Sequence, residues 1–228
     1  MKVLVIIAQP DDPEFFCGGT VAKWSSEGHD VRYVIVTGGE KGSDDPDMTP
    51  AKLVATRRDE QRNAALVLGV HDVTFLSHVD GELLNSLDAR RDIAREIRRA
   101  KPDVVVTTDP LTLNYGATRV NHNDHRKVGM AVCDAIFPAA GNRMYFPELL
   151  ADGFEPHYPR EIYFAGAAQP NTLMDVTPHI DKKIAAIREH VTQVKDPSRV
   201  DIRMMQGALR MRPDGSTYFA EAFRRVLL

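Results

Sequence analysis

The sequence predicts an α/β protein, a Rossmann-like three-layer sandwich in which helices cover both faces of a mostly parallel sheet. Short, uninterrupted apolar runs such as VLVII and VVVTT are typical of strands buried on both faces. These runs alternate with longer helical segments, which is the order of β-α-β units. Because 228 residues with 43% hydrophobic content can bury one sizeable core, we expect a single domain over residues 1–228.

The first half of the chain alternates between strands and helices. The apolar strand at the N-terminus is continuous, and Gly28 ends the helix that follows it. A stretch rich in Gly, Asp and Pro predicts a long loop before the second helix. In order, we expect a strand at 2–8, a helix at 18–27, a strand at 31–37, a loop at 38–50, a helix at 51–68 and a strand at 73–76.

The second half continues the alternation and is expected to end in helices. Its elements are a helix at 88–100, a strand at 104–108, a loop at 110–121, a helix from about 122 to 137, a strand at 162–165, a helix at 178–194 and then one or two final helices. Acidic residues interrupt the arginines of the first of these helices, which predicts a solvated helix face; these arginines are Arg90, Arg91, Arg95, Arg98 and Arg99.

Charge, hydropathy and cysteine content indicate which kinds of partner and which compartment to expect. With 29 basic and 32 acidic residues the net charge is −3, so we expect no nucleic-acid and no membrane partner. No apolar run approaches the length of a membrane span, and the first run is too short for a signal peptide. Two cysteines in a chain of this size suit a reducing compartment, which predicts a cytoplasmic protein.

Two adjacent carboxylates, Asp11 and Asp12, follow the first strand, where ligands bind in parallel sheets. Asp12 followed by Pro13 also has the pattern of a helix start, with Asp12 as the N-cap. Helix capping does not explain the second carboxylate, because neighbouring carboxylates repel unless a cation or a proton stabilises one of them. A divalent metal would allow one Asp to bind it while the other takes a proton from metal-bound water.

A second cluster, His122, Asp124 and His125, follows the strand at 104–108 and its loop. Histidines three positions apart share one face of a helical turn, and with an intervening Asp they form a plausible metal-ligand and acid–base group. Capping of the helix by Asn121, with Asp124 completing a capping-box-like turn, is compatible with this role. Asp12, His125 and Gln9 would give three protein ligands and an open position, as in catalytic zinc sites.

These motifs resemble the zinc-dependent N-acetylglucosaminyl deacetylases of the LmbE/PIG-L type. The family's first motif, Ala-His-Pro-Asp-Asp, corresponds to AQPDD at 8–12, and its His-Pro-Asp-His motif corresponds to HNDH at 122–125. Matches between and after these motifs extend the resemblance over nearly the whole chain; they are Gly18-Gly19-Thr20, Ala22-Lys23, Arg57-Arg58-Asp59-Glu60, Leu68-Gly69-Val70, Asp80-Gly81 and Ala220-Glu221-Ala222-Phe223.

The resemblance implies a role for each residue of the two motifs. Asp12 and His125 would bind zinc, and Asp11 would be the general base that activates the zinc-bound water. His122 would stabilise the oxyanion or protonate the leaving amine. Asp124 would hold His122 in its tautomer and orientation, as carboxylates commonly do for imidazoles.

The resemblance also implies substrate contacts. Arg57 would contact substrate hydroxyls or a phosphate, and an exposed helix arginine is the alternative for this residue. Tyr115, Arg119 and Arg160 are further residues that we expect to line the pocket.

Gln9 departs from the family pattern, because it stands where the family has its first histidine ligand. A glutamine can offer its side-chain carbonyl oxygen, which is a harder and weaker zinc ligand than imidazole. We hypothesise that the site still binds a divalent metal, Zn²⁺ or another, through Gln9, Asp12 and His125. The alternative is that Gln9 only hydrogen-bonds in the pocket and that metal affinity is lost.

The function predicted from these features is a metal-dependent hydrolase that removes an N-acyl group from a small substrate, an N-acetylated sugar derivative. One alternative is a metal-dependent hydratase of the same fold, acting on small dicarboxylates. Another is a catalytically weakened metabolite-binding homologue. An ordinary nucleotide-binding domain is the weakest alternative, because no Gly-x-Gly-x-x-Gly turn follows the first strand. A homo-oligomer is possible.

Overall fold

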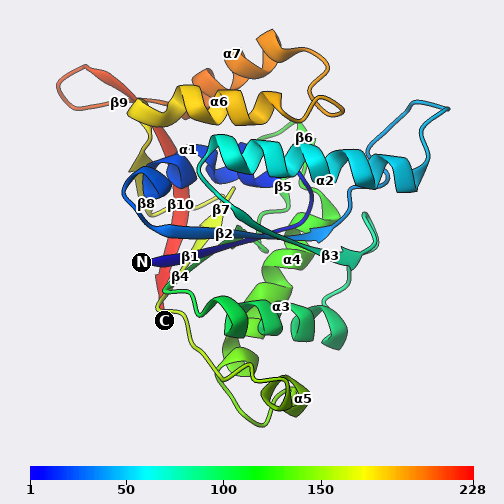
Figure 1. The fold of residues 1–228 in the computed structure, drawn as a ribbon. Coiled ribbons are helices and arrows are strands. Elements are labelled where there is room, and N and C mark those ends of the chain that lie inside the picture. The colour runs from blue at the N-terminus through cyan, green and yellow to red at the C-terminus, as the bar shows by residue number, and fades with distance from the viewer.

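A mostly parallel sheet forms the centre of the molecule in the computed structural model, which describes residues 1–228 apart from the side chains of residues 200 and 203 (Figure 1). The strand order is β3-β2-β1-β4-β7-β10-β8, with β9 paired to β10. The first five strands run parallel and β10 runs antiparallel to its neighbours. The strands are β1 Lys2–Ile7, β2 Asp30–Thr37, β3 Asp72–His78, β4 Val104–Thr108, β7 Glu161–Ala165, β8 Thr172–Asp175, β9 Leu209–Met211 and β10 Thr217–Leu227.

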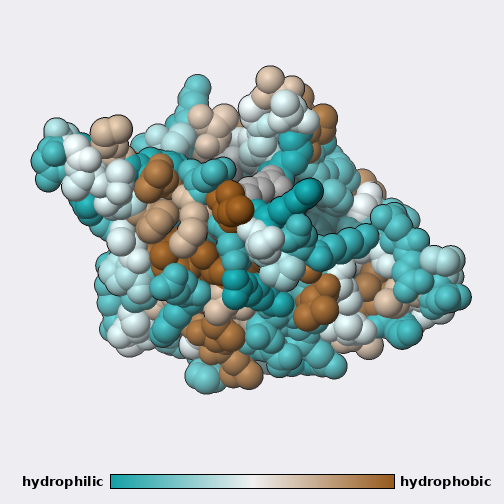
Figure 2. All heavy atoms as spheres, turned by 90° about the horizontal axis from the view of Figure 1, so that it is seen from above, coloured by the Kyte–Doolittle hydropathy of each residue, from teal (hydrophilic) through white to brown (hydrophobic). Residues whose placement is uncertain are grey.

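Helices cover both faces of this sheet, which confirms the predicted three-layer α/β fold (Figure 1). On one side lie α1 Asp12–Ser26, α2 Pro50–Val67, α6 Ile180–Arg188 and α7 Pro197–Ala208; on the other lie α3 Leu87–Ala100, α4 Asn123–Asp134 and α5 Pro147–Ala151. Seen from the α6 and α7 side, apolar patches are dispersed among hydrophilic residues (Figure 2). Among the described residues, no helix is both long and apolar enough to cross a bilayer.

Strand β1 shows why an uninterrupted apolar run was needed. Val3, Val5 and Ile7 belong to the core cluster under α1 and α2, whereas Leu4 and Ile6 belong to the cluster on the α3 and α4 face. Successive side chains of a strand point to opposite faces, so a central strand of this sheet requires apolar residues at every position. This strand places the residues that follow Ile7 at the carboxyl edge of the sheet.

The C-terminal part of the chain corrects the sequence prediction. Helix α7 is present, but the chain then ends in strands β9 and β10 and not in helix. The charged residues Glu221, Arg224 and Arg225 obscure the strand pattern. Arg225 forms an ion pair with Glu161 on the neighbouring strand β7, with 2.7 Å between Nη2 and Oε1. Pairing across the sheet thus stabilises a strand whose sequence carries a weak local signal.

Several element bounds also differ from the prediction. Helix α1 begins at Asp12 and not at residue 18, with non-helical backbone angles at Cys17, and Asp11 and not Asp12 occupies the N-cap position. Short strands β5 Asn114–Tyr115 and β6 Arg119–Val120 form a hairpin inside the predicted loop. A π-helical turn, η1 Ala135–Ala140, follows α4, and a 3₁₀ turn, η2 Thr177–His179, precedes the shorter helix α6.

Arg98 corrects the prediction of a solvated arginine face on α3. Its side chain is buried, and its guanidinium donates to the carbonyl oxygens of Ala139, Ala140, Asn142 and Tyr145. Burial of the guanidinium lowers the pKa of Arg98. A planar group with five N–H donors can satisfy several carbonyls at once, so this arginine holds the turn after η1 in place.

A buried ion pair attaches α1 to the C-terminal strand. Glu221 accepts from the backbone N–H groups of Gly19 and Thr20, and Lys183 Nζ lies 2.6 Å from Glu221 Oε1.

We expect Lys183→Met to destabilise the fold by about 3 kcal/mol, because it leaves the buried Glu221 carboxylate without its cation. Urea unfolding followed by circular dichroism measures this loss, and an unchanged midpoint would contradict it.

Candidate functional site

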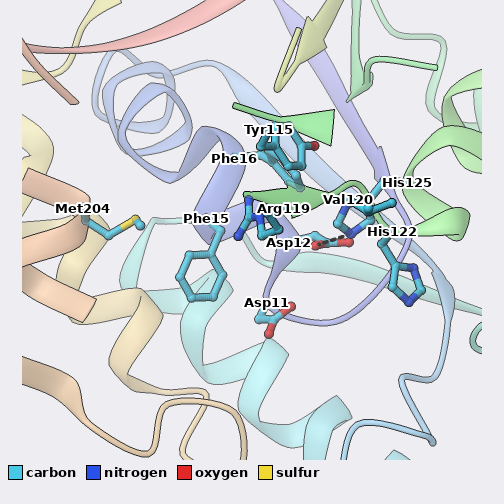
Figure 3. A pocket seen from close by; sticks show the side chains of 10 residues that line it. All are labelled: Asp11, Asp12, Phe15, Phe16, Tyr115, Arg119, Val120, His122, His125 and Met204. Atoms are coloured by element: carbon cyan, nitrogen blue, oxygen red, sulfur yellow. Dashed lines mark ion pairs between the residues drawn. The ribbon is translucent and has the colours of Figure 1, made fainter. Parts of the chain in front are cut away.

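A cavity of about 450 Å³ opens at the carboxyl edge of the sheet (Figure 3). The turn between β1 and α1, the β5–β6 hairpin, the start of α4 and one residue of α7 contribute to it. Half of its lining is aromatic or aliphatic and the remainder is charged or imidazole. The lining residues are Asp11, Asp12, Phe15, Phe16, Tyr115, Arg119, Val120, His122, His125 and Met204.

Asp12 and His125 come from the two predicted motifs and meet in this cavity (Figure 3). Asp12 Oδ1 lies 3.0 Å from His125 Nε2, and Asp12 Oδ2 accepts from the backbone N–H of Gln9 at 2.9 Å. Burial by itself lowers the pKa of His125, but the charge of Asp12 and the hydrogen bond to it outweigh burial, so the pKa lies above its ordinary value. The two motifs, remote in sequence, therefore bring an acidic and an imidazole ligand atom together.

The other nitrogen of the His125 ring is held by Asn121. His125 Nδ1 lies 3.0 Å from Asn121 Oδ1, which can only accept a hydrogen bond. Nδ1 therefore carries a proton, and Nε2 faces Asp12. The sequence makes Asn121 a candidate helix cap. In the structure its side chain instead orients His125, and His122 occupies the N-cap position of α4.

Asp11 lies beside Asp12 with its backbone in the left-handed region, at φ 90°. Burial first, and the neighbouring charge of Asp12 second, raise the pKa of Asp11 to about 7, although Arg57 opposes the shift. A carboxylate with a pKa near neutrality is well matched to accepting and returning a proton. The Asp11 side chain is one of those that line the cavity (Figure 3).

His122 is oriented by backbone and not by the Asp124 carboxylate, which differs from the implied role of Asp124. His122 Nδ1 accepts from the backbone N–H of Asp124 at 3.2 Å, so Nε2 carries the proton of the neutral ring. Asp124 Oδ2 instead accepts from the Gly81 N–H at 2.6 Å and from Gln9 Nε2 at 3.0 Å. Burial raises the pKa of Asp124.

Gln9 points its amide nitrogen at two carboxylates. Its Nε2 donates to Asp80 Oδ1 at 2.7 Å and to Asp124 Oδ2 at 3.0 Å, and lies 3.3 Å from His122 Nδ1. Because carboxylates accept hydrogen bonds, this contact fixes the orientation of the amide. No described residue donates to Gln9 Oε1, so the carbonyl oxygen is the uncommitted end of the side chain.

Asp80 belongs to this group, although its match to the family pattern predicted no role for it. It lies two residues after the end of β3 and therefore at the same edge of the sheet as the other acidic residues. Ligand atoms of Asp80, His122 and Asp124 lie within 4.8 Å of one another and could together hold a cation. Its position after a strand, next to Gly81, was the signal that could have identified it.

Arg57 does not reach the cavity, contrary to the expected substrate contact. It is 3% exposed, and its guanidinium donates to the carbonyl oxygens of Gly39 and Pro10 at 2.9 and 2.5 Å. Its Nη2 also lies 3.5 Å from Asp11 Oδ1. Gly39 is required beside it, because a Cβ there would lie 2.2 Å from Arg57 Nη1. The arginine thus supports the β1–α1 turn from behind.

The remaining predicted substrate contacts separate into two groups. Tyr115 and Arg119 line the cavity, with the Arg119 guanidinium 4.7 Å from the centre of the Tyr115 ring. Burial raises the pKa of Tyr115 to about 12. Arg160 instead precedes β7, where its N–H donates to Asp103. The amino ends of parallel strands lie at the opposite edge of the sheet, so Arg160 is not brought to the site.

The apolar wall of the cavity was missed in the sequence. Phe15 and Phe16 come from the first turns of α1, and Val120 and Met204 come from β6 and α7. The Phe16 ring packs edge-on against His125, with 5.2 Å between ring centres. The two phenylalanines follow Asp11 and Asp12 so closely that the sequence itself held a signal for them, whereas Met204 is brought in only by tertiary packing.

The fold and this cluster define an α/β protein with a pocket of carboxylates and imidazoles at the carboxyl edge of its sheet. A sequence model of the family described as "PIG-L: GlcNAc-PI de-N-acetylase" matches residues 4–136, which include both motifs. The chain therefore belongs to the PIG-L family, and the resemblance inferred from the motifs is confirmed.

Relatives of the chain include two kinds of enzyme. It is 31% identical to the diacetylchitobiose deacetylase of Thermococcus kodakarensis, over 84% of this chain and 70% of that protein. It is 29% identical to the 4-oxalmesaconate hydratase of Pseudomonas putida, over 82% of this chain and 72% of that protein. The structure of N,N'-diacetylchitobiose deacetylase from Pyrococcus horikoshii, complexed with its inhibitor MPG, superposes with a TM-score of 0.86 at 29% identity, covering 99% of this chain and 84% of that one.

Proposed function

We propose that this protein is a metal-dependent deacetylase that hydrolyses the N-acetyl group of an amino-sugar-type substrate. The observation that carries the proposal is the meeting of Asp12 with His125 beside Asp11 in one open cavity. The relatives named as diacetylchitobiose deacetylases support the substrate class. Zinc is the expected metal, because an imidazole and a carboxylate with an open position are typical of catalytic zinc sites.

The side chains fit a divalent cation held by Asp12 and His125. Their ligand atoms lie 3.0 Å apart, and Asn121 fixes the proton on His125 Nδ1, which leaves Nε2 as the ligand atom. Gln9 would contribute Oε1, the end of its amide that no described residue occupies. A bound zinc ion would lower the pKa of a water molecule and polarise the amide carbonyl.

A cation held by Asp80, His122 and Asp124 is the competing placement. Gln9 Nε2 already contacts all three residues and donates to both carboxylates, so a cation there would have to displace the amide. Asp12 and His125 contact each other, and a cation between them would not have to displace the Gln9 amide. We therefore place the proposed metal at Asp12 and His125.

In the proposed reaction, Asp11 transfers the protons and His122 stabilises the developing charge. Asp11 takes a proton from the attacking water, whose oxygen forms the new bond to the acyl carbon. His122, which carries its proton on Nε2, donates a hydrogen bond to the developing oxyanion. The proton held by Asp11 passes to the nitrogen as the carbon–nitrogen bond breaks, and the products are acetate and a free amine.

Hydration of a carbon–carbon double bond is the second candidate, because one relative is named a hydratase. A dicarboxylate substrate would favour a pocket lined by several cations. Among the described residues, the cavity contains one arginine, Arg119, and a wall of Phe15, Phe16, Val120 and Met204. This lining favours a substrate with apolar faces, such as a sugar ring, over a small dianion.

Metal content and acetate release test the proposed function, and Gln9→His is the informative variant. An imidazole at position 9 can give one N–H to Asp80 or Asp124 and keep its second nitrogen for the metal. We expect wild type to purify with about one zinc per chain and to release acetate from N-acetylated amino sugars, with zinc affinity raised about tenfold in Gln9→His.

The outcomes separate the alternatives. Zinc in Gln9→His but none in wild type would overturn the proposal in favour of a metabolite-binding protein. Zinc in neither protein would exclude the proposed ligand set. Zinc in wild type with hydration of an unsaturated dicarboxylate, and no acetate release, would replace the deacetylase by the hydratase.

A further inference from the structure

We propose that Gln61 is a positioning residue that, together with Arg57, clamps one peptide unit and thereby aims the Asp11 carboxylate at the reacting amide. The inference rests on the proposed function, in which Asp11 is the general base. Gln61 lies on α2 and touches neither the cavity nor the proposed ligands Asp12 and His125. Its action on the reaction would therefore pass through Asp11.

The two ends of the Pro10–Asp11 peptide are each held by a side chain of α2. Arg57 Nη2 donates to the Pro10 carbonyl oxygen at 2.5 Å, and the Asp11 N–H donates to Gln61 Oε1 at 2.9 Å. Carbonyl and N–H belong to the same planar unit and point in opposite directions. Residues four apart on a helix lie on one face, so Arg57 and Gln61 can grip both ends of this unit together.

The clamp holds a backbone conformation that Asp11 would otherwise leave. At φ 90° Asp11 is in the left-handed region, which residues with a Cβ seldom adopt. This backbone angle determines where the Cβ atom of Asp11 lies. Fixing the preceding peptide at both ends therefore fixes the direction of the Cα–Cβ bond of Asp11, and Arg57 Nη2, 3.5 Å from Asp11 Oδ1, limits the rotation of the carboxylate itself.

Gln61 is itself held so that its oxygen faces Asp11. Its Nε2 donates to Glu14 Oε1 and Oε2 at 3.0 and 3.1 Å, and Glu14 Oε2 lies 3.0 Å from His190 Nε2. All three side chains are completely buried. Because a carboxylate accepts, the Gln61 amide cannot turn over without losing both contacts, and Oε1 stays directed at the Asp11 N–H.

His190 completes this buried group and explains why Glu14 is tolerated there. Burial by itself lowers the pKa of His190, but the hydrogen bond to Glu14 and the Glu14 charge outweigh it and raise the pKa. A fully buried carboxylate requires hydrogen-bond donors, and Gln61 and His190 supply them. The group thus extends from His190, just after α6, through Glu14 and Gln61 to the turn that carries Asp11.

The matched variants are Gln61→Met and Glu60→Met. Both replace a buried polar side chain of α2 by methionine, but Glu60 bonds Thr192 and makes no contact with Asp11. We expect Gln61→Met to lower kcat about 100-fold, with KM and zinc content unchanged, because a small displacement of a reacting group has effects of this size. Glu60→Met is expected to lower the thermal midpoint and to leave kcat near wild type.

A double-mutant cycle tests whether the effect passes through Asp11. In an Asp11→Asn background, Gln61→Met is expected to cause no further loss of kcat, because the base is already absent. A further 100-fold loss there, or a wild-type kcat in Gln61→Met, would overturn the proposed positioning role. If Gln61→Met does not fold, Gln61→Asn keeps the amide but is one methylene shorter, and the same loss of kcat is expected.

This design keeps the two proposals apart. If the wild type releases no acetate, the proposed function fails. If the wild type is active and Asp11→Asn retains its kcat, deacetylation stands, but Asp11 is not the general base and the positioning role of Gln61 fails with it. If Asp11→Asn is inactive and Gln61→Met is fully active, the proposed function stands and the positioning role fails.

Discussion

Asp11→Asn is expected to lower kcat for amide hydrolysis by about 10²–10⁴-fold, the usual contribution of a positioned general base. Asparagine has the same shape but cannot take up the proton that the attacking water must lose. The backbone N–H of residue 11 remains available to Gln61 Oε1, so the turn is expected to persist. Acetate release under saturating substrate, with zinc content measured on the same sample, checks this result.

The stability of this variant serves as its control. Burial and the neighbouring Asp12 charge raise the pKa of Asp11, which means that the folded protein disfavours the ionised carboxylate. Asp11→Asn is therefore expected to leave the thermal midpoint unchanged or slightly raised. Loss of activity together with loss of zinc would instead mean that Asp11 is a ligand, and retained activity would remove it from the mechanism.

His125→Ala is expected to weaken zinc binding by at least about 100-fold, because removing a ligand exceeds the 10–100-fold effect of removing its outer partners. Without the imidazole, Asp12 and Gln9 would be the remaining proposed ligands. Dialysis against a chelator of known affinity, followed by metal analysis, measures the change. Activity is expected to fall with the zinc content.

His122→Ala is the matched control, since it removes the second imidazole of the same motif. With the metal at Asp12 and His125, this variant is expected to keep its zinc and to lose activity through the missing Nε2 donor. The reverse pattern, zinc lost in His122→Ala and kept in His125→Ala, would place the metal at Asp80, His122 and Asp124 and contradict the proposed ligand set.

The two site motifs could be predicted from the sequence because each is recognised by residues close to it in the chain. Asp11 and Asp12 lie in the turn after a strand with apolar residues on both faces, and His122 and His125 lie at the start of a helix. The carboxyl ends of neighbouring parallel strands meet at one edge, so the two motifs could be expected to converge. Asp12 and His125 do lie 3.0 Å apart.

Other residues could not be placed from the sequence because their direction depends on long-range packing. Arg57 has a motif position that resembles a substrate contact, yet the β1–α1 turn presents the Pro10 carbonyl to its guanidinium. Arg160 is close in sequence to a sheet strand but precedes it, and so lies at the far edge. The final strand β10 forms because β7 and β8 offer it partners on both sides.

The sequence by itself thus determined the α/β class, the order of the central elements and which residue types meet at the carboxyl edge. These follow from apolar periodicity and from the positions of polar residues relative to strands. Tertiary structure decided what each polar atom does: the Gln9 amide nitrogen faces Asp80 and Asp124, and Gln61 reaches the Asp11 N–H. Hydrogen-bond partners are chosen by distance and direction in three dimensions, and residues 50 or more positions apart in the chain supply them here.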